Sequence, residues 1–228
     1  MNTGITWWLI IISHLLFSLV NFIAWKKGCI SLTGETKLIN SLAGINIKNI
    51  AGIFLLGLPL ILSADNWSLL LSWPVSVSLL QVLVAVILLS LTCMVSLYSA
   101  MKKTRTYAQA GKITILPAIA PAAFYLLVRI IFLVIYECFF RGLLLFTCIG
   151  ICGITGAILI NLFYYSMIHA FNERSEMLAC VPFGIVLCGI SIYWQSLLPA
   201  ILFHLLLAVT HESYILFTYS PSPKTIKP

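Results

Sequence analysis

The residues best suited to chemistry are one glutamate, one arginine and two histidines, all placed in apolar sequence. Glu137 and Arg141 lie four residues apart in YECFFRG, between the apolar runs IIFLVI and LLLF. Residues with this spacing share one face of a helix, so the two charges are expected to pair. His169 and His204 lie in two further apolar runs. Ionisable residues within lipid are costly and usually mark a functional site.

These residue types together predict hydrolysis. A carboxylate with a histidine can take a proton from water, and we assign this step to Glu137 and His169. The second histidine, His204, would stabilise the oxyanion of the tetrahedral intermediate, while Arg141 would orient the carboxylate and keep it ionised. The same inventory also suits a zinc site or a proton relay in a transporter. No cofactor is predicted, and zinc is not excluded.

The composition predicts an integral membrane protein. The 228 residues are 61% hydrophobic and only 8% charged, and several apolar runs reach the length that spans a bilayer. The runs are continuous rather than alternating, which favours helices over a barrel. The net charge of +7 gathers in a few loops, as expected of cytoplasmic loops, so nucleic acid is not a predicted partner. The seven cysteines show no metal-binding spacing and are expected in the core.

The fold class is therefore predicted to be an all-α polytopic bundle of about seven transmembrane helices. The lysine-bearing segments 26–48 and 101–117 and the C-terminal tail are expected on the cytoplasmic side. The predicted spans are 5–25, 49–64, 74–100, 118–149, 153–171, 177–194 and 197–217.

Helix rise indicates whether the polar residues can meet. Glu137 lies roughly 18 Å from a glycine-containing turn between residues 149 and 153, and His169 lies roughly 24 Å from the same turn. His204 would lie roughly 10 Å into a helix that starts on that side. All three therefore fall within the hydrocarbon layer, and modest helix tilts would bring them level.

Three segments resemble the motifs of a known family, the CAAX-prenyl endopeptidase and bacteriocin-processing (Abi) family of glutamic-type intramembrane proteases. They are YECFFRG around Glu137, YSMIH ending at His169 and LPAILFH ending at His204, and the resemblance covers about residues 118–212. Two positions depart from the family pattern. Tyr136 stands where the family has the first glutamate of its Glu-Glu pair, and Ala208 stands where it has an asparagine or aspartate.

The resemblance implies an intramembrane endopeptidase that cuts a membrane-associated protein, prenylated or bearing a sorting signal, near its C-terminal region. Residues 1–117 would form a scaffold, 118–217 the protease core and 218–228 a flexible tail. The expected catalytic residues are Glu137, Arg141, His169 and His204. The expected partners are a membrane-associated protein substrate and the lipid bilayer, in the bacterial inner membrane; the oligomeric state is left open.

A second interpretation stays open because of the two departures. A catalytically impaired relative would use the old active-site cavity to bind or regulate membrane proteins, and the changes at Tyr136 and Ala208 favour it. The transporter interpretation predicts matching broken helices in two halves of the chain, and the sequence has no such repeat.

Four other polar residues receive structural interpretations. Arg129 would either line the cavity or extend toward the membrane surface. Asn161 and Tyr165 precede His169 on its predicted helix face and are expected to orient its ring. Glu212, near the end of the last span, is expected at the membrane interface.

Overall fold

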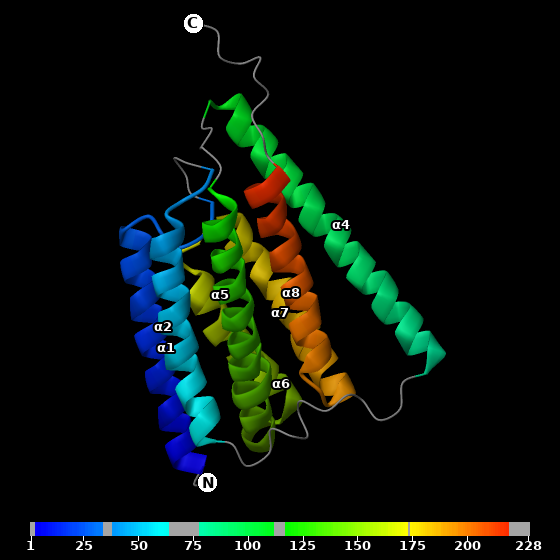
Figure 1. The fold of residues 1–228 in the computed structure, drawn as a ribbon. Coiled ribbons are helices and arrows are strands. Elements are labelled where there is room, and N and C mark those ends of the chain that lie inside the picture. The colour runs from blue at the N-terminus through cyan, green and yellow to red at the C-terminus, as the bar shows by residue number, and fades with distance from the viewer. Residues whose placement is uncertain (1–2, 34–37, 64–77, 112–116, 173, 219–228) are drawn as a thin grey trace, which may run out of the picture.

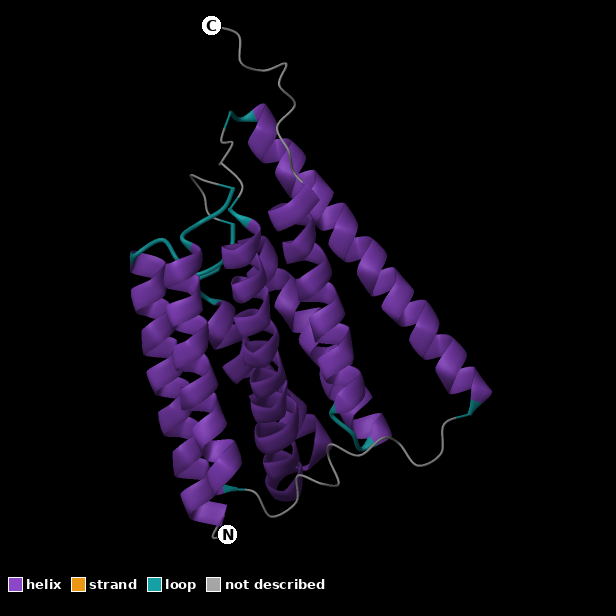
Figure 2. Ribbon diagram, in the orientation of Figure 1, coloured by secondary structure: helices purple, strands orange, loops and turns teal. Residues whose placement is uncertain are grey.

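The computed structural model describes residues 3–33, 38–63, 78–111, 117–172 and 174–218. Within these residues all regular structure is helical, as Figure 2 shows, which confirms the all-α class. The elements are α1 (Thr3–Lys26), α2 (Leu42–Leu62), α4 (Leu79–Gln109), α5 (Ile119–Glu137), the π-helix η2 (Cys138–Leu144), α6 (Leu145–His169), α7 (Arg174–Trp194), α8 (Leu198–Ser213) and the π-helix η3 (Tyr214–Thr218).

Six helical segments among the described residues are long and apolar enough to cross a membrane. One of them, Ile119–His169, has 51 residues and would be roughly 75 Å long if it were straight. It is not straight, because Gly153 has φ 71° and ψ 178° inside α6, a left-handed conformation that glycine tolerates. Arg141 Nη1 and Asn161 Oδ1, on opposite sides of Gly153, are only 3.1 Å apart. The segment therefore crosses twice, and about seven crossings describe the integral membrane protein.

The helices form a bundle with one splayed member (Figure 1). Helix α2 packs against α1 and α5, whereas α4 packs mainly against α8 and leans away from the rest. Large apolar side chains are exposed along α4, including Leu79, Leu80 and Met94. In a bilayer this exposed surface lies against lipid tails. The free-energy cost of exposing apolar side chains to water therefore does not arise.

Close contact between α2 and its neighbours depends on Gly52. A Cβ atom at this position would lie 2.5 Å from the Phe132 ring and 2.7 Å from the Phe17 ring. Both phenylalanines are buried in the main core cluster, which also contains Tyr136 and Phe140. A glycine at position 52 thus allows α1, α2 and α5 to pack close to the site described below.

Two predicted boundaries were wrong at lysine-bearing segments. Helix α2 begins at Leu42 rather than near residue 49, because Ser41 caps its N-terminus by accepting a hydrogen bond from the Gly44 N–H. Lys48 therefore lies in the helix and not in the preceding loop. Its side chain is buried, with Nζ 2.5 Å from the Ile30 carbonyl oxygen.

Helix α4 continues to Gln109 rather than ending near residue 100, so Lys102, Lys103 and Arg105 extend the helix. The predicted start of this span at residue 74 lies outside the described residues, as does the tail beyond residue 218. The C-terminal ends of α1, α4 and α8 nevertheless lie at the same end of the bundle, with the N-terminus at the other (Figure 1). We call this the basic end; its location in the cytoplasm stays a prediction.

Candidate active site

Glu137 and Arg141 form the predicted ion pair. Glu137 is the last residue of α5, Arg141 lies in η2, and both side chains are fully buried. Arg141 Nε lies 3.6 Å from Glu137 Oε2. A buried carboxylate next to a guanidinium is stabilised in its ionised form, since neither charge is left uncompensated. The pair expected from the i, i+4 spacing is thus present.

His204 of α8 contacts the other oxygen of the same carboxylate. Its Nδ1 lies 2.5 Å from Glu137 Oε1. An ionised carboxylate can only accept hydrogen bonds, so Nδ1 carries a proton and donates it. In the neutral ring the lone pair then lies on Nε2, which has no hydrogen-bond partner among the described residues. Glu137 is thereby held between a guanidinium and an imidazole.

The π-helix η2 positions Arg141 and is fixed by Asn161 of α6. The Leu145 N–H donates to the Phe140 carbonyl five residues back, which widens this turn. Asn161 Nδ2 donates to the same carbonyl at 2.5 Å, and its Oδ1 accepts from Arg141 Nη1 at 3.1 Å. The expectation that Asn161 orients His169 was therefore wrong. Its fully buried amide instead holds the guanidinium and the irregular backbone together.

Tyr165 lies between the ion pair and His169. Arg141 Cζ is 4.4 Å from the centroid of the Tyr165 ring, an attractive cation–π geometry. The Tyr165 ring also packs against the His169 ring, with the two centroids 4.8 Å apart. No hydrogen bond joins His169 to Glu137 or His204 among the described residues. The structure thus brings three of the four predicted residues into direct contact and places His169 one aromatic ring away.

Several polar atoms around this ion pair are buried without a hydrogen-bond partner in the described part of the chain. They are the Tyr136 hydroxyl, Glu137 Oε2, Arg141 Nε and Nη2, and His169 Nε2. More than nine in ten buried polar groups in native proteins are hydrogen-bonded, and exceptions call for a functional explanation. A cluster of such atoms has the capacity to bind a polar group, such as water or a peptide bond, inside an apolar bundle.

The two positions that depart from the family motifs both face this region. Tyr136 is buried, and its ring centroid lies 6.0 Å from that of His204 and 4.6 Å from that of Phe140. Ala208 is buried on α8, one turn after His204. A methyl group offers no hydrogen bond, whereas the Tyr136 hydroxyl can donate one. The residue in place of the missing carboxylate is therefore polar but no base.

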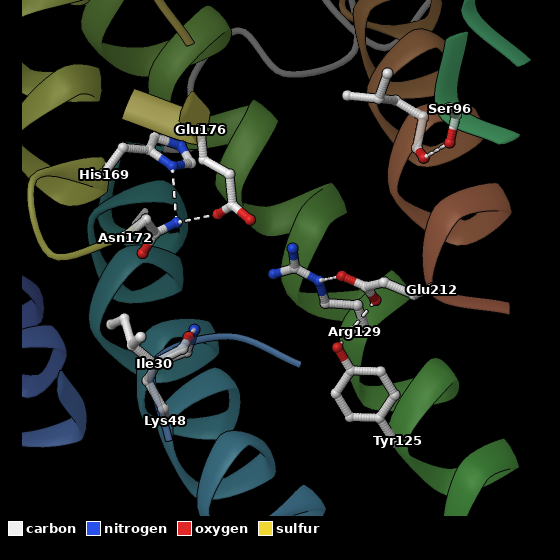
Figure 3. A network of polar contacts seen from close by, with 10 residues as sticks. Ile30, Lys48, Ser96, Tyr125, Arg129, His169, Asn172, Glu176 and Glu212 are labelled. Atoms are coloured by element: carbon white, nitrogen blue, oxygen red, sulfur yellow. Dashed lines mark hydrogen bonds and ion pairs between the residues drawn. The ribbon is translucent and has the colours of Figure 1, made fainter. Parts of the chain in front are cut away.

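A second, partly buried ion pair joins α5 to the last turn of α8 (Figure 3). Arg129 Nε donates to Glu212 Oε1 at 3.1 Å, and the Tyr125 hydroxyl donates to Glu212 Oε2 at 3.0 Å. We call these three residues the Arg129–Glu212 cluster. Glu212 lies in the last turn of α8, near the end of its span as expected. Its depth in the membrane, and the two expectations for Arg129, stay predictions. Opposite charges in two apolar spans were the sequence signal for this pair.

The described residues contain no group of three or more His, Cys, Asp or Glu side chains that could hold a metal ion. Glu137 and His204 contact each other directly, but the next potential ligand, His169, is separated from them by Tyr165. The expectation of no cofactor, with zinc left open, stays a prediction.

A comparison with known protein families found a match to part of the chain. Residues 118–210 match the family model described as type II CAAX prenyl endopeptidase Rce1-like. The match begins just before α5 and includes Glu137, Arg141, His169 and His204. Comparisons with curated proteins and with solved structures gave no match.

Proposed function

Because residues 118–210 match the type II CAAX prenyl endopeptidase Rce1-like family model, we propose that this integral membrane protein is an intramembrane endopeptidase. Its substrate would be a membrane-associated protein, prenylated or carrying a sorting signal, cut near its C-terminal region. The observation that carries the proposal is the Glu137 carboxylate held between Arg141 and His204 among unpartnered polar atoms. The proposed location is the bacterial inner membrane, with the basic end in the cytoplasm.

The contact between Glu137 and His204 supports a different division of labour from the one expected from the sequence. Glu137 holds the proton of His204 on Nδ1, so the lone pair of Nε2 can take a proton from water, as in other carboxylate–histidine pairs. The water oxygen then attacks the carbonyl carbon of the scissile peptide. When the tetrahedral intermediate collapses, the C–N bond breaks and His204 returns the proton to the leaving nitrogen.

Arg141 acts on this pair through its charge. Its charge lies 3.6 Å from the carboxylate oxygen that His204 leaves unbound, which favours the ionised form of Glu137 before and after proton transfer. The carboxylate also stabilises the imidazolium that forms when His204 accepts a proton. The apolar surroundings strengthen both electrostatic interactions because little water screens them.

The alternative function is a catalytically impaired relative that binds membrane proteins at the same site. Two observations favour it: the residue before Glu137 is a tyrosine rather than a carboxylic acid, and Ala208 offers no hydrogen bond to an oxyanion. The two proposals make opposite predictions for turnover but similar predictions for binding, so only a cleavage assay separates them.

The test is cleavage of a farnesylated peptide with a C-terminal CAAX sequence by the purified protein in lipid vesicles, followed by mass spectrometry. Wild type is expected to cleave, and His204→Ala is expected to lose nearly all turnover while still binding the peptide. Addition of a chelator is expected to change nothing; a loss restored by zinc would contradict the proposed mechanism.

Binding of the peptide without cleavage would favour the impaired relative. The double variant Tyr136→Glu/Ala208→Asn then becomes informative. A gain of cleavage in it would show that the two departures removed an activity that the rest of the site still supports.

A further inference from the structure

A chain of hydrogen bonds at the turn between α6 and α7 holds His169. The residues that form this chain with His169 have no role in the mechanism proposed above. Asn172 Nδ2 lies 3.2 Å from His169 Nδ1 and 3.1 Å from Glu176 Oε2, as drawn in Figure 3. The Asn172 N–H also donates to the His169 carbonyl at 3.0 Å, which closes the turn. One amide group thus connects the end of α6 to the first turn of α7.

The charge of Glu176 decides the direction of these hydrogen bonds. A carboxylate only accepts, so the Asn172 atom that faces Glu176 must be the amide nitrogen rather than the oxygen. The same nitrogen lies next to His169 Nδ1 and has a second N–H to donate. His169 Nδ1 therefore acts as the acceptor, and the proton of the neutral ring lies on Nε2.

The remaining contacts of Glu176 are compatible with this arrangement. Lys103 Nζ lies 3.4 Å from the other carboxylate oxygen, Oε1, so each oxygen has its own partner. The other basic side chains drawn near this turn are engaged elsewhere: Lys48 with the Ile30 carbonyl and Arg129 with Glu212. Oε2 of Glu176 is thus left to Asn172.

The opposite ring nitrogen of His169 is one of the buried atoms without a partner in the described residues. The ring packs against Tyr165, which also contacts Arg141, so His169 borders the proposed active site. An Nε2–H in this place is a hydrogen-bond donor, not a base. It is the group that developing negative charge on a substrate oxygen requires.

We propose that Asn172 and Glu176 are positioning residues that fix the His169 proton on Nε2, so that His169 donates a hydrogen bond to the substrate oxyanion. The catalytic part of this proposal rests on the proposed peptidase function, whereas the position of the proton does not. It also exchanges the sequence-based roles of the two histidines: His204 becomes the base and His169 the oxyanion donor.

The tautomer can be measured directly by NMR of the full chain in lipid nanodiscs with ¹⁵N-labelled histidine. The chain has four histidines, and the His169 signals are assigned by their loss in His169→Gln. The expected spectrum shows a protonated Nε2 and an unprotonated Nδ1 for His169. A proton on Nδ1 instead would overturn the proposal, whether or not any substrate is cleaved.

Asn172→Asp provides the decisive variant. The new carboxylate can only accept, so the His169 proton is expected to move to Nδ1, and turnover is expected to fall by about 10²–10³-fold with little change in KM. Glu176→Gln is expected to have a smaller effect on both measurements, because an amide can still accept from Asn172. Should Asn172→Asp fail to accumulate, the wild-type spectrum and Glu176→Gln still decide the outcome.

Asn40→Asp is the matched control, because the Asn40 amide also donates a hydrogen bond, to the Ser31 carbonyl, but in a loop without a histidine. It is expected to leave the His169 signals and the turnover of folded protein unchanged. Wild-type turnover in Asn172→Asp, with the tautomer shifted, would overturn the catalytic role. A wild type without turnover on any substrate would contradict the proposed function, while the spectra would still test the positioning residues.

Discussion

The Glu137–Arg141 and Arg129–Glu212 ion pairs differ in how completely their buried polar atoms are hydrogen-bonded. In the Arg129–Glu212 cluster both carboxylate oxygens accept a hydrogen bond, one from Arg129 and one from Tyr125. In the Glu137–Arg141 pair only Oε1 does so, from His204, while Glu137 Oε2 and two nitrogens of Arg141 have no hydrogen-bond partner among the described residues. Both pairs join a glutamate and an arginine within apolar helices.

This difference separates a structural pair from a functional one. A pair without unpartnered buried atoms, such as Arg129 and Glu212 among the described residues, stabilises one arrangement of helices and has no buried donor or acceptor left for a substrate. A pair with unused donors and acceptors costs stability, because buried polar groups without partners are unfavourable. Such a cost persists where the groups bind something else during function. The comparison thus predicts that matched substitutions change turnover in one pair and folding in the other.

The largest effect is expected from Glu137→Gln, with Glu212→Gln as its matched control. Glu137→Gln keeps the size of the side chain but removes the negative charge that stabilises the His204 imidazolium, so turnover should fall by about 10²–10⁴-fold. Glu212→Gln should cleave at a rate near wild type per folded molecule. Cleavage of the farnesylated peptide, normalised to folded protein, measures both. Equal losses of turnover in the two variants would show that the two ion pairs do not differ in function.

The second expected effect is on folding. Arg129→Ala leaves Glu212 buried without its cation, which should lower the free energy of unfolding by about 3–5 kcal/mol. The double variant Arg129→Met/Glu212→Leu should recover much of this loss, since apolar side chains of similar volume often replace a buried pair without cost. Denaturation in mixed micelles measures the change. If Arg129→Ala unfolds like wild type, the cluster is solvated and not a structural pair.

A smaller effect is expected from Asn161→Ala, which removes the side chain that links Arg141 to the Phe140 carbonyl. Loss of these buried hydrogen bonds should cost about 1–3 kcal/mol of stability, and a misplaced Arg141 should also lower turnover. The combination of both losses in one variant would show that the functional pair depends on this support. Unchanged turnover would show that Arg141 keeps its position without Asn161.

The smallest effect is expected at Gly184 of α7. A Cβ atom there would lie 2.7 Å from Leu162 Cδ2 and 3.6 Å from Arg141 Nη2, whereas one at Gly189 on the same helix would meet nothing within 4 Å. Gly184→Ala should therefore cost about 1 kcal/mol through overpacking, and Gly189→Ala should be close to neutral. Denaturation of both variants in mixed micelles measures the difference. A neutral Gly184→Ala would mean that the Leu162 side chain moves aside freely.

The fold could be predicted from the sequence where apolar runs and glycine determine the outcome. Backbone groups in lipid must be bonded within each segment, so the long runs predict helices, and the turn expected between residues 149 and 153 is found at Gly153. Lys48 and Lys102 were placed in loops because charges usually flank spans. The structure places both within helices. Lys48 contacts the Ile30 carbonyl oxygen, and Lys102 lies where α4 extends beyond its apolar run.

The candidate site could be predicted only as far as its residue types and spacing allow. The i, i+4 rule was enough for Glu137 and Arg141, and helix depth was enough to expect His204 nearby. Which histidine contacts the carboxylate depends on helix rotation, which depth does not determine. The roles of Asn161 and Asn172 depend on contacts between elements far apart or across a turn, and no local pattern carries that information.

The π-helix η2 also affects how this chain should be aligned with other sequences. A π-turn accommodates one more residue than an α-helical turn, so the extra residue is absorbed between Cys138 and Leu144 and the side chains after Leu144 keep their register with those before Cys138. Deleting a single residue between Cys138 and Leu144 would therefore restore a regular α-helix and leave the following segment, up to Gly153, in nearly the same orientation. Relatives that differ by such a deletion would need a one-residue gap in this turn when aligned, although the helical segments on either side would keep the same neighbours.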